Sequence, residues 1–206
     1  MSLPILETKY PVVEIFKSYQ MEGFNQGKEV VFVRFAGCNL ECAWCDTDYS
    51  KAFEMSIPEI IDVISDFGLF DIVITGGEPT IHNLEQFLKA LKMFKSWIAI
   101  ETNGTNKIPA RISRYLDYIS VSPKSCSVNV FQANEVRIPV DGGSFTIEYL
   151  KRIQRLIEAD RYYLSPVERD GKFEFISAVT LLNQINGEVD KKWRLSLQTH
   201  KLLGIR

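Results

Sequence analysis

The stretch that decides the fold is residues 29–45, EVVFVRFAGCNLECAWC. Residues 29–35 are rich in β-branched and aromatic side chains and are closed by Gly37, a pattern that predicts a buried β-strand. Cys38, Cys42 and Cys45 follow directly. We therefore expect a strand that carries a loop of clustered thiols at its carboxyl end.

Strands and helices are predicted to alternate along the rest of the chain. Further strands are expected at residues 70–75, 97–101, 117–121, 134–140, 161–164 and 194–198. Helices are expected after a capping box at Ser56 and Glu59, over residues 84–91, weakly before residue 117, after a cap at Ser144, and over residues 175–184. Such alternation predicts right-handed βαβ units in a parallel sheet with helices outside.

The number of units limits the architecture. About six βα units fit this chain, whereas a closed eight-stranded barrel takes about 250 residues. We therefore expect an α/β fold in which one domain, residues 1–206, forms an incomplete TIM-like βα barrel. Ligands of such folds bind beyond the carboxyl ends of the strands.

Composition and charge exclude several classes of protein. The chain has 206 residues, which suits a single domain, and hydrophobic residues make up 46% of it, which excludes a disordered chain. A net charge of −2 argues against direct binding of nucleic acid. The longest stretch without Asp, Glu, Lys or Arg, residues 175–187, is short of the roughly 20 residues of a membrane span. Because the N-terminus also lacks the basic start of a signal peptide, we expect a cytoplasmic protein.

The three clustered cysteines form a C-x3-C-x2-C motif. Three thiolates in one short loop can hold one metal cluster, and a four-iron, four-sulfur cube bound this way keeps one iron open. A structural zinc ion would instead need a fourth donor from the protein. Candidates for that donor are His82, His200 and Cys126. A third alternative is a set of buried cysteines without any metal.

Polar loops marked by glycine or proline follow other predicted strands. They are residues 75–79 (TGGEP), 101–105 (ETNGT) and 122–124 (SPK). Paired glycines allow the backbone to approach a ligand closely, and the Glu78 carboxylate could hold an ammonium group. Each loop alone could be an ordinary turn, but together with the thiol loop they predict a binding site at the strand ends.

The C-x3-C-x2-C motif followed by GGEP resembles the radical S-adenosylmethionine (SAM) superfamily. More narrowly, residues 45–47 (CDT), 101–105 (ETNGT), 121–124 (VSPK) and 198–206 (QTHKLLGIR) resemble the 7-carboxy-7-deazaguanine synthases. The resemblance implies a radical SAM core with a [4Fe-4S] cluster, SAM and Mg²⁺ as cofactors. It further implies a lyase that converts 6-carboxy-5,6,7,8-tetrahydropterin to 7-carboxy-7-deazaguanine. In that reaction a 5′-deoxyadenosyl radical abstracts hydrogen, the ring contracts and ammonia leaves.

The resemblance also assigns roles to individual residues. Cys38, Cys42 and Cys45 would ligate the cluster, and Thr47 would supply the side-chain ligand of Mg²⁺. The positions that match SAM contacts are Trp44, Gly76, Gly77, Glu78, Asn103, Ser122, Pro123, Lys124 and Ser165. The positions that match substrate contacts are Tyr19, Gln20, Met21, Glu22, Arg34, Thr75, His200 and the C-terminal carboxylate of Arg206. Residues 1–28 would then be a substrate-contacting extension of a partial barrel formed by residues 29–206.

Some residues depart from the family pattern, and others have a second possible role. Met21 stands where the family has glycine, and Ser165 where it commonly has glutamine. Glu101 matches a ribose acceptor, with a structural role inside the sheet as the alternative, and Cys126 suits a small buried hydrophobe.

The family implies a homodimer, an external electron donor such as flavodoxin or ferredoxin, and a product for 7-deazaguanine pathways such as queuosine in tRNA. Alternative functions are another small radical SAM enzyme, such as a glycyl-radical activase, or a zinc-stabilised interaction module.

Overall fold

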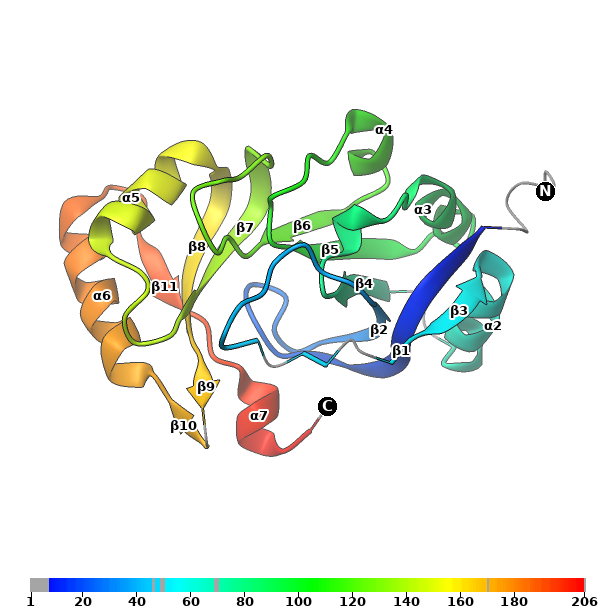
Figure 1. Cartoon of the computed structure of the whole chain (residues 1–206), viewed down its shortest axis with the longest axis horizontal. Helices are drawn as coiled ribbons and strands as arrows, with labels where there is room; N and C mark the ends of the chain where they lie inside the picture. The colour runs from blue at the N-terminus through cyan, green and yellow to red at the C-terminus, as the bar shows by residue number, and fades with distance from the viewer. Residues whose placement is uncertain (1–7, 46, 49–50, 69–70, 170, 206) are drawn as a thin grey trace.

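The fold is one twisted sheet with helices on its outer face (Figure 1). The computed structural model describes residues 8–45, 47–48, 51–68, 71–169 and 171–205. Its nine-stranded sheet has the order β11-β8-β7-β6-β5-β4-β2-β1-β3. Each neighbouring pair from β2 to β11 is parallel, and β1 pairs antiparallel with both β2 and β3. The predicted incomplete βα barrel is thus confirmed.

The elements have the following bounds. The strands are β1 (Lys9–Gln20), β2 (Lys28–Phe35), β3 (Phe53–Ser56), β4 (Asp71–Gly76), β5 (Trp97–Thr102), β6 (Tyr118–Val121), β7 (Gln132–Val140), β8 (Glu158–Pro166), β9 (Glu168–Arg169), β10 (Lys172–Phe173) and β11 (Trp193–Leu195). The helices are α2 (Ile57–Asp66), η1 (Pro79–Ile81), α3 (Glu85–Lys92), α4 (Ala110–Ser113), α5 (Ile147–Leu156), α6 (Phe175–Glu188) and α7 (Thr199–Leu203).

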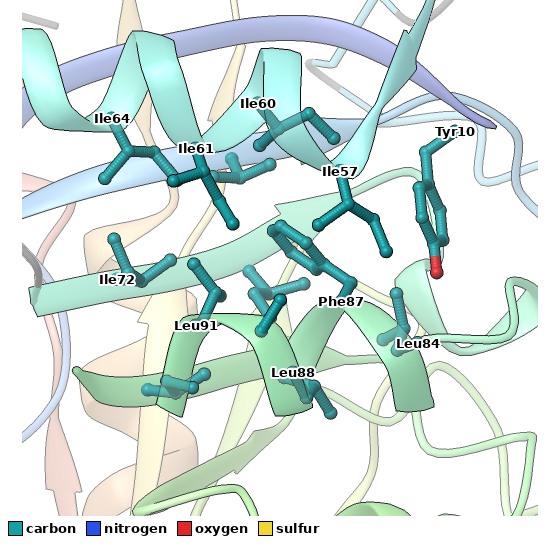
Figure 2. Packing of buried hydrophobic residues seen from close by; sticks show 14 of the residues in the cluster. Tyr10, Ile57, Ile60, Ile61, Ile64, Ile72, Leu84, Phe87, Leu88 and Leu91 are labelled. Carbon is teal, nitrogen blue, oxygen red and sulfur yellow. The ribbon is translucent and has the colours of Figure 1, made fainter. Parts of the chain in front are cut away.

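Two apolar clusters fill the space between the sheet and its helices. In the first, α2 and α3 pack over β2, β4 and β5 (Figure 2). The isoleucines of α2 lie at helical spacing, and Ile60 and Ile64 are completely buried. The second cluster joins α5 and α6 to β7 and β8. Because this layer lies entirely on the outer face, the inner face of the sheet is left to form the site.

The inner face changes from apolar to polar along each strand. At the level of Phe32, Val73 and Ala99 it carries a small apolar cluster. Side chains two residues apart on a strand share a face, so the next inward positions toward the carboxyl ends are Arg34, Thr75 and Glu101. The parallel strands therefore bring polar groups that are distant in the sequence to one end of the sheet.

Most predicted elements are present, with instructive differences. The strand predicted at residues 194–198 is shorter, since β11 ends at Leu195, and the short helix α7 begins at Thr199. The first residue of the predicted strand at 70–75, Phe70, lies outside the described residues. The segment predicted as an N-terminal extension contains β1, a 12-residue strand that pairs with β2 and with the short edge strand β3.

The predicted cap at Ser144 was wrong. The helix α5 begins two residues later, and its N-cap is Thr146, whose hydroxyl accepts a hydrogen bond from the Tyr149 N–H at 3.2 Å. The Ser144 hydroxyl instead donates to the Asp141 carboxylate, which closes the preceding turn. A nearby carboxylate thus competes successfully with the helix for the serine.

No helix in the described part of the chain is both long and apolar enough to cross a membrane.

The corrected cap gives a prediction about stability. Thr146→Ala should lower the free energy of unfolding by about 1 kcal/mol, because an N–H in the first turn of α5 loses its acceptor. Ser144→Ala should change it by less than about 0.5 kcal/mol, since the serine lies in an exposed turn. Urea unfolding of both variants compares them directly. Equal losses, or a larger loss for Ser144→Ala, would contradict the assignment of the cap.

Candidate functional site

The thiol loop starts at the carboxyl end of β2. The cysteines Cys38, Cys42 and Cys45 are all free thiols, as the sequence predicts for clustered ligands. Two backbone contacts shape the loop: the Cys45 N–H donates to the Cys42 carbonyl at 3.0 Å, and the Leu40 N–H donates to Cys38 Sγ at 3.4 Å. Burial raises the pKa of the Cys42 thiol, the other two thiols raise it further, and Lys124 lowers it. Such a donor set suits a group that binds thiolates and brings positive charge.

The glycine pair after β4 lies directly against this loop. The Gly77 N–H donates to the Phe35 carbonyl at 3.1 Å, and the Glu78 N–H donates to the Gly37 carbonyl at 2.8 Å. A Cβ at Gly77 would lie 2.1 Å from the Gly37 carbonyl oxygen and 2.9 Å from Cys38 Cβ. Only a residue without a side chain allows this approach, so the two loops predicted to hold the cluster and SAM form one surface.

Glu78 is fully buried beneath that surface. Its carboxylate accepts hydrogen bonds from the Thr102 hydroxyl at 2.7 Å and the Asn103 N–H at 2.6 Å, and also from the backbone and hydroxyl of Thr80. The side chain therefore ties the loop after β4 to the loop after β5. Its predicted contact with the methionine end of SAM stays a prediction.

A cavity of about 200 Å³ lies beside the thiol and glycine loops. It brings together seven of the residues predicted to contact SAM: Trp44, Gly76, Gly77, Asn103, Ser122, Lys124 and Ser165. The Lys124 ammonium lies 4.9 Å from the centre of the Trp44 ring and 2.6 Å from the Ser122 hydroxyl oxygen. Pro123 is not among the residues that line this cavity; its carbonyl accepts a hydrogen bond from the Tyr149 hydroxyl of α5 at 3.1 Å.

A larger cavity of about 760 Å³ adjoins the first. It is lined by every described residue predicted to contact substrate: Tyr19, Gln20, Met21, Glu22, Arg34, Thr75 and His200. Thr47, the predicted Mg²⁺ ligand, lines it too. Arg34 forms an ion pair at 2.9 Å with Glu14, its partner on β1. Arg206 and Asp46 lie outside the described residues.

The sequence analysis missed the residue at the centre of the site, Arg137 on β7. Its guanidinium is almost completely buried and pairs with Glu101, with Glu22 at 2.9 Å, and with Glu135 at 3.1 Å. Glu101 also accepts hydrogen bonds from Gln20 Nε2 and the Thr75 hydroxyl, both at 3.0 Å. Glu101 lies on β5 and also lines both cavities, so its two alternative roles, ribose acceptor and structural group, both stay predictions.

The local sequence does hold a signal for this network. Glu135 and Arg137 lie two residues apart in the buried stretch 135–140, which is otherwise apolar, so both charges must face the same side of the sheet. Buried charges are rarely tolerated unless they are paired. This pattern indicates a buried charge cluster, although it does not identify the partners.

The network controls the protonation of Glu101. Burial alone would raise the pKa of Glu101, but the Arg137 charge and the hydrogen bonds from Arg137, Thr75 and Gln20 outweigh it and lower that pKa. Burial would likewise lower the pKa of Arg137, and the surrounding carboxylates raise it instead. Glu101 and Arg137 therefore stay charged at neutral pH.

The turn after β1 fits against Glu135. Gly23 has a φ of +66°, and a Cβ there would lie 2.4 Å from Glu135 Oε1. The next residue, Phe24, donates its N–H to Glu135 Oε2 at 2.9 Å. The preceding Met21 lines the large cavity while its carbonyl accepts a hydrogen bond from the Thr199 hydroxyl at 3.0 Å. The departure from glycine at position 21 is therefore accommodated, whereas position 23 requires glycine.

Comparisons with known proteins agree with this geometry. The family model described as the radical SAM superfamily matches residues 32–176. The chain is 46% identical over 207 residues to a 7-carboxy-7-deazaguanine synthase of Haemophilus influenzae, covering 97% of this chain and 95% of the relative. It is 40% identical over 206 residues to a protein of the same name from Neisseria meningitidis, covering 96% and 94%.

Solved structures show the same likeness. The crystal structure of QueE from Escherichia coli matches with a TM-score of 0.73 and 27% identity, covering 95% of this chain and 97% of that chain. The structure of SuiB from Streptococcus suis bound to S-adenosylmethionine matches with a TM-score of 0.50 and 15% identity over 77% of this chain and 44% of that one. This second likeness concerns the fold alone.

The close packing at Gly77 can be tested with a matched pair of variants. Gly77→Ala should lower the free energy of unfolding by about 1–3 kcal/mol, because the new methyl group forces the segment from Gly37 to Cys38 to move. Gly143→Ala is the control, since a Cβ there meets nothing within 4 Å. Denaturant unfolding should leave the control within about 1 kcal/mol of the wild type. An unaffected Gly77→Ala protein would show that the loops do not depend on this contact.

Proposed function

This chain belongs to the 7-carboxy-7-deazaguanine synthase family of radical SAM enzymes, and we propose that it converts 6-carboxy-5,6,7,8-tetrahydropterin to 7-carboxy-7-deazaguanine with loss of ammonia. One observation carries the proposal above others. The described residues matched to substrate contacts, although they come from the two ends of the chain and from β2 and β4, all line one cavity. Its volume of about 760 Å³ is within the range of small-molecule sites.

The residues present fit the cofactors of the family. Three free thiols on one loop can ligate a [4Fe-4S] cluster, and Gly76 and Gly77 line the adjacent cavity, where the amino-acid end of SAM would lie. When bound, these cofactors supply one electron and a 5′-deoxyadenosyl radical, which removes a hydrogen atom from the substrate and starts its ring contraction.

The chain's own residues bind and orient the reactants. Gln20 and Glu22 offer acceptors and donors for the amide-and-amine edge of a pterin, and Arg34 offers a guanidinium for its carboxylate. Trp44 and Lys124 border the neighbouring cavity, where the adenosyl group of SAM would lie. Thr75 lines both cavities, so the reacting groups meet where the two join.

Further parts of the function follow from the family alone. We propose that Thr47 helps to bind Mg²⁺, that flavodoxin or ferredoxin supplies the electron, and that the enzyme works as a cytoplasmic homodimer. We also propose that its product enters queuosine biosynthesis. The superfamily match favours an enzyme over a zinc-stabilised interaction module, and the relatives' names favour a synthase over a glycyl-radical activase.

Turnover by oxygen-free protein tests the proposal directly. Reconstituted enzyme with SAM, reductant, Mg²⁺ and carboxytetrahydropterin should form a product with the mass and absorbance of the deazapurine. Cys42→Ala should lose both SAM cleavage and bound iron, because the cluster loses one of its three ligands. Cys126→Ala should keep both, since this thiol packs against the outer core. Absence of product with fully loaded wild-type enzyme would refute the proposed reaction.

The variant Thr47→Ala distinguishes a role of Thr47 in Mg²⁺ binding from a role in SAM cleavage. The variant should need about tenfold more Mg²⁺ for half-maximal turnover, because a side-chain oxygen ligand is lost, while substrate-independent SAM cleavage stays near the wild-type rate. Titration of Mg²⁺ with both assays measures this. An equal loss of SAM cleavage and turnover would contradict the assignment of Thr47 to the metal.

A further inference from the structure

The Arg137 network lies in the wall that the two cavities share. Glu22 and Glu101 line both cavities, and Arg137 lines the smaller one. Only 7% of the Arg137 side chain is exposed, so the guanidinium acts mainly on its neighbours in the protein. Those neighbours include Glu22, which is predicted to contact substrate.

The hydrogen bonds form a closed ring around this wall. Arg137 Nη1 donates to Glu22 Oε2 at 2.9 Å, and Nη2 donates to Glu101 Oε1. Gln20 completes the ring: its Nε2 donates to Glu101 Oε1 at 3.0 Å, and its Oε1 accepts from the Glu22 N–H at 3.0 Å. The orientation of the Glu22 carboxylate thus depends on a guanidinium that contacts two carboxylates at once.

Other groups complete the surroundings of Glu22. Its Oε1 accepts a hydrogen bond from Gln198 Nε2 at 3.2 Å, which comes from the C-terminal segment. Each carboxylate oxygen can accept more than one hydrogen bond, so both retain capacity for a donor from a ligand. Arg137 is surrounded by three carboxylates, those of Glu22, Glu101 and Glu135. The excess of negative charge suits the N–H donors of a pterin edge.

We propose that Arg137 is a positioning residue for substrate: it holds the Glu22 carboxylate in the shared wall, where Glu22 accepts hydrogen bonds from the pterin. This inference rests on the proposed function. Lysine cannot replace arginine here, because a single ammonium group lacks the planar fork that contacts Glu22 and Glu101 together.

Binding measurements on the loaded enzyme without reductant test the inference, because no turnover then occurs. Arg137→Lys should raise the dissociation constant of carboxytetrahydropterin about tenfold or more and that of SAM by less than about threefold. Arg111→Lys is the matched control: Arg111 pairs at 3.0 Å with Glu85 on the outer surface, and its loss should change neither constant.

A double-variant cycle tests whether Arg137 acts through Glu22. Glu22→Gln should also weaken pterin binding, and adding Arg137→Lys to it should weaken binding by less than about threefold more, since residues that act as one unit are not additive. Should Arg137→Lys not accumulate as folded protein, Arg137→Gln, which retains amide donors, replaces it in the cycle.

The outcomes separate the two proposals. Wild-type affinity for pterin in the Arg137 variants, an equal weakening of SAM, or effects that multiply in the double variant would each overturn the positioning role. Failure of both Arg137 variants to fold would overturn it as well, because the arginine would then serve the fold. Failure of the wild-type enzyme itself to bind pterin would instead refute the proposed function.

Discussion

The interior of the sheet depends on one buried cation. Arg137 reaches carboxylates from the turn after β1, from β5 and from its own strand, so it connects parts of the chain that the apolar layers leave apart. Removal of one partner from a buried ion pair typically costs about 3–5 kcal/mol, because the other charge is left without compensation. Such a network gives little net stability over an apolar core. Its value here is that it fixes polar groups in one arrangement at the edge of two cavities.

The two faces of the sheet have different roles: the outer face packs against the helices, and the inner face forms the candidate site. The outer face carries the apolar clusters under the helices, and these supply most of the driving force for folding. The inner face has a small apolar floor, and above it the ends of several strands contribute polar groups or glycine loops to the two cavities. This separation keeps the polar groups of the site apart from the main apolar core.

Local patterns were sufficient to predict the strands, the main helices and the loops at the strand ends. The apolar, β-branched runs that indicated β2 and β4 depend only on neighbouring residues, and so does the C-x3-C-x2-C spacing. Contacts between distant residues could not be predicted in this way. Glu22 and Arg137 are 115 positions apart, and nothing in either segment specifies the other.

The sequence analysis did not predict the strand β1, because much of β1 is only half-buried and its alternation of apolar and polar residues is therefore weak. The cap of α5 was misassigned because two hydroxyl residues compete and Asp141 binds the nearer one.

The turn after β1 and the C-terminal segment meet at the large cavity. Gly23 donates its N–H to the Ser196 hydroxyl at 2.9 Å, and Gln198 and Thr199 bond to Glu22 and to the Met21 carbonyl. During synthesis the residues around 196–199 leave the ribosome long after the turn that they must contact. The strands up to β8 can therefore assemble on the nascent chain, but the large cavity has no complete rim until residues 196–199 have emerged.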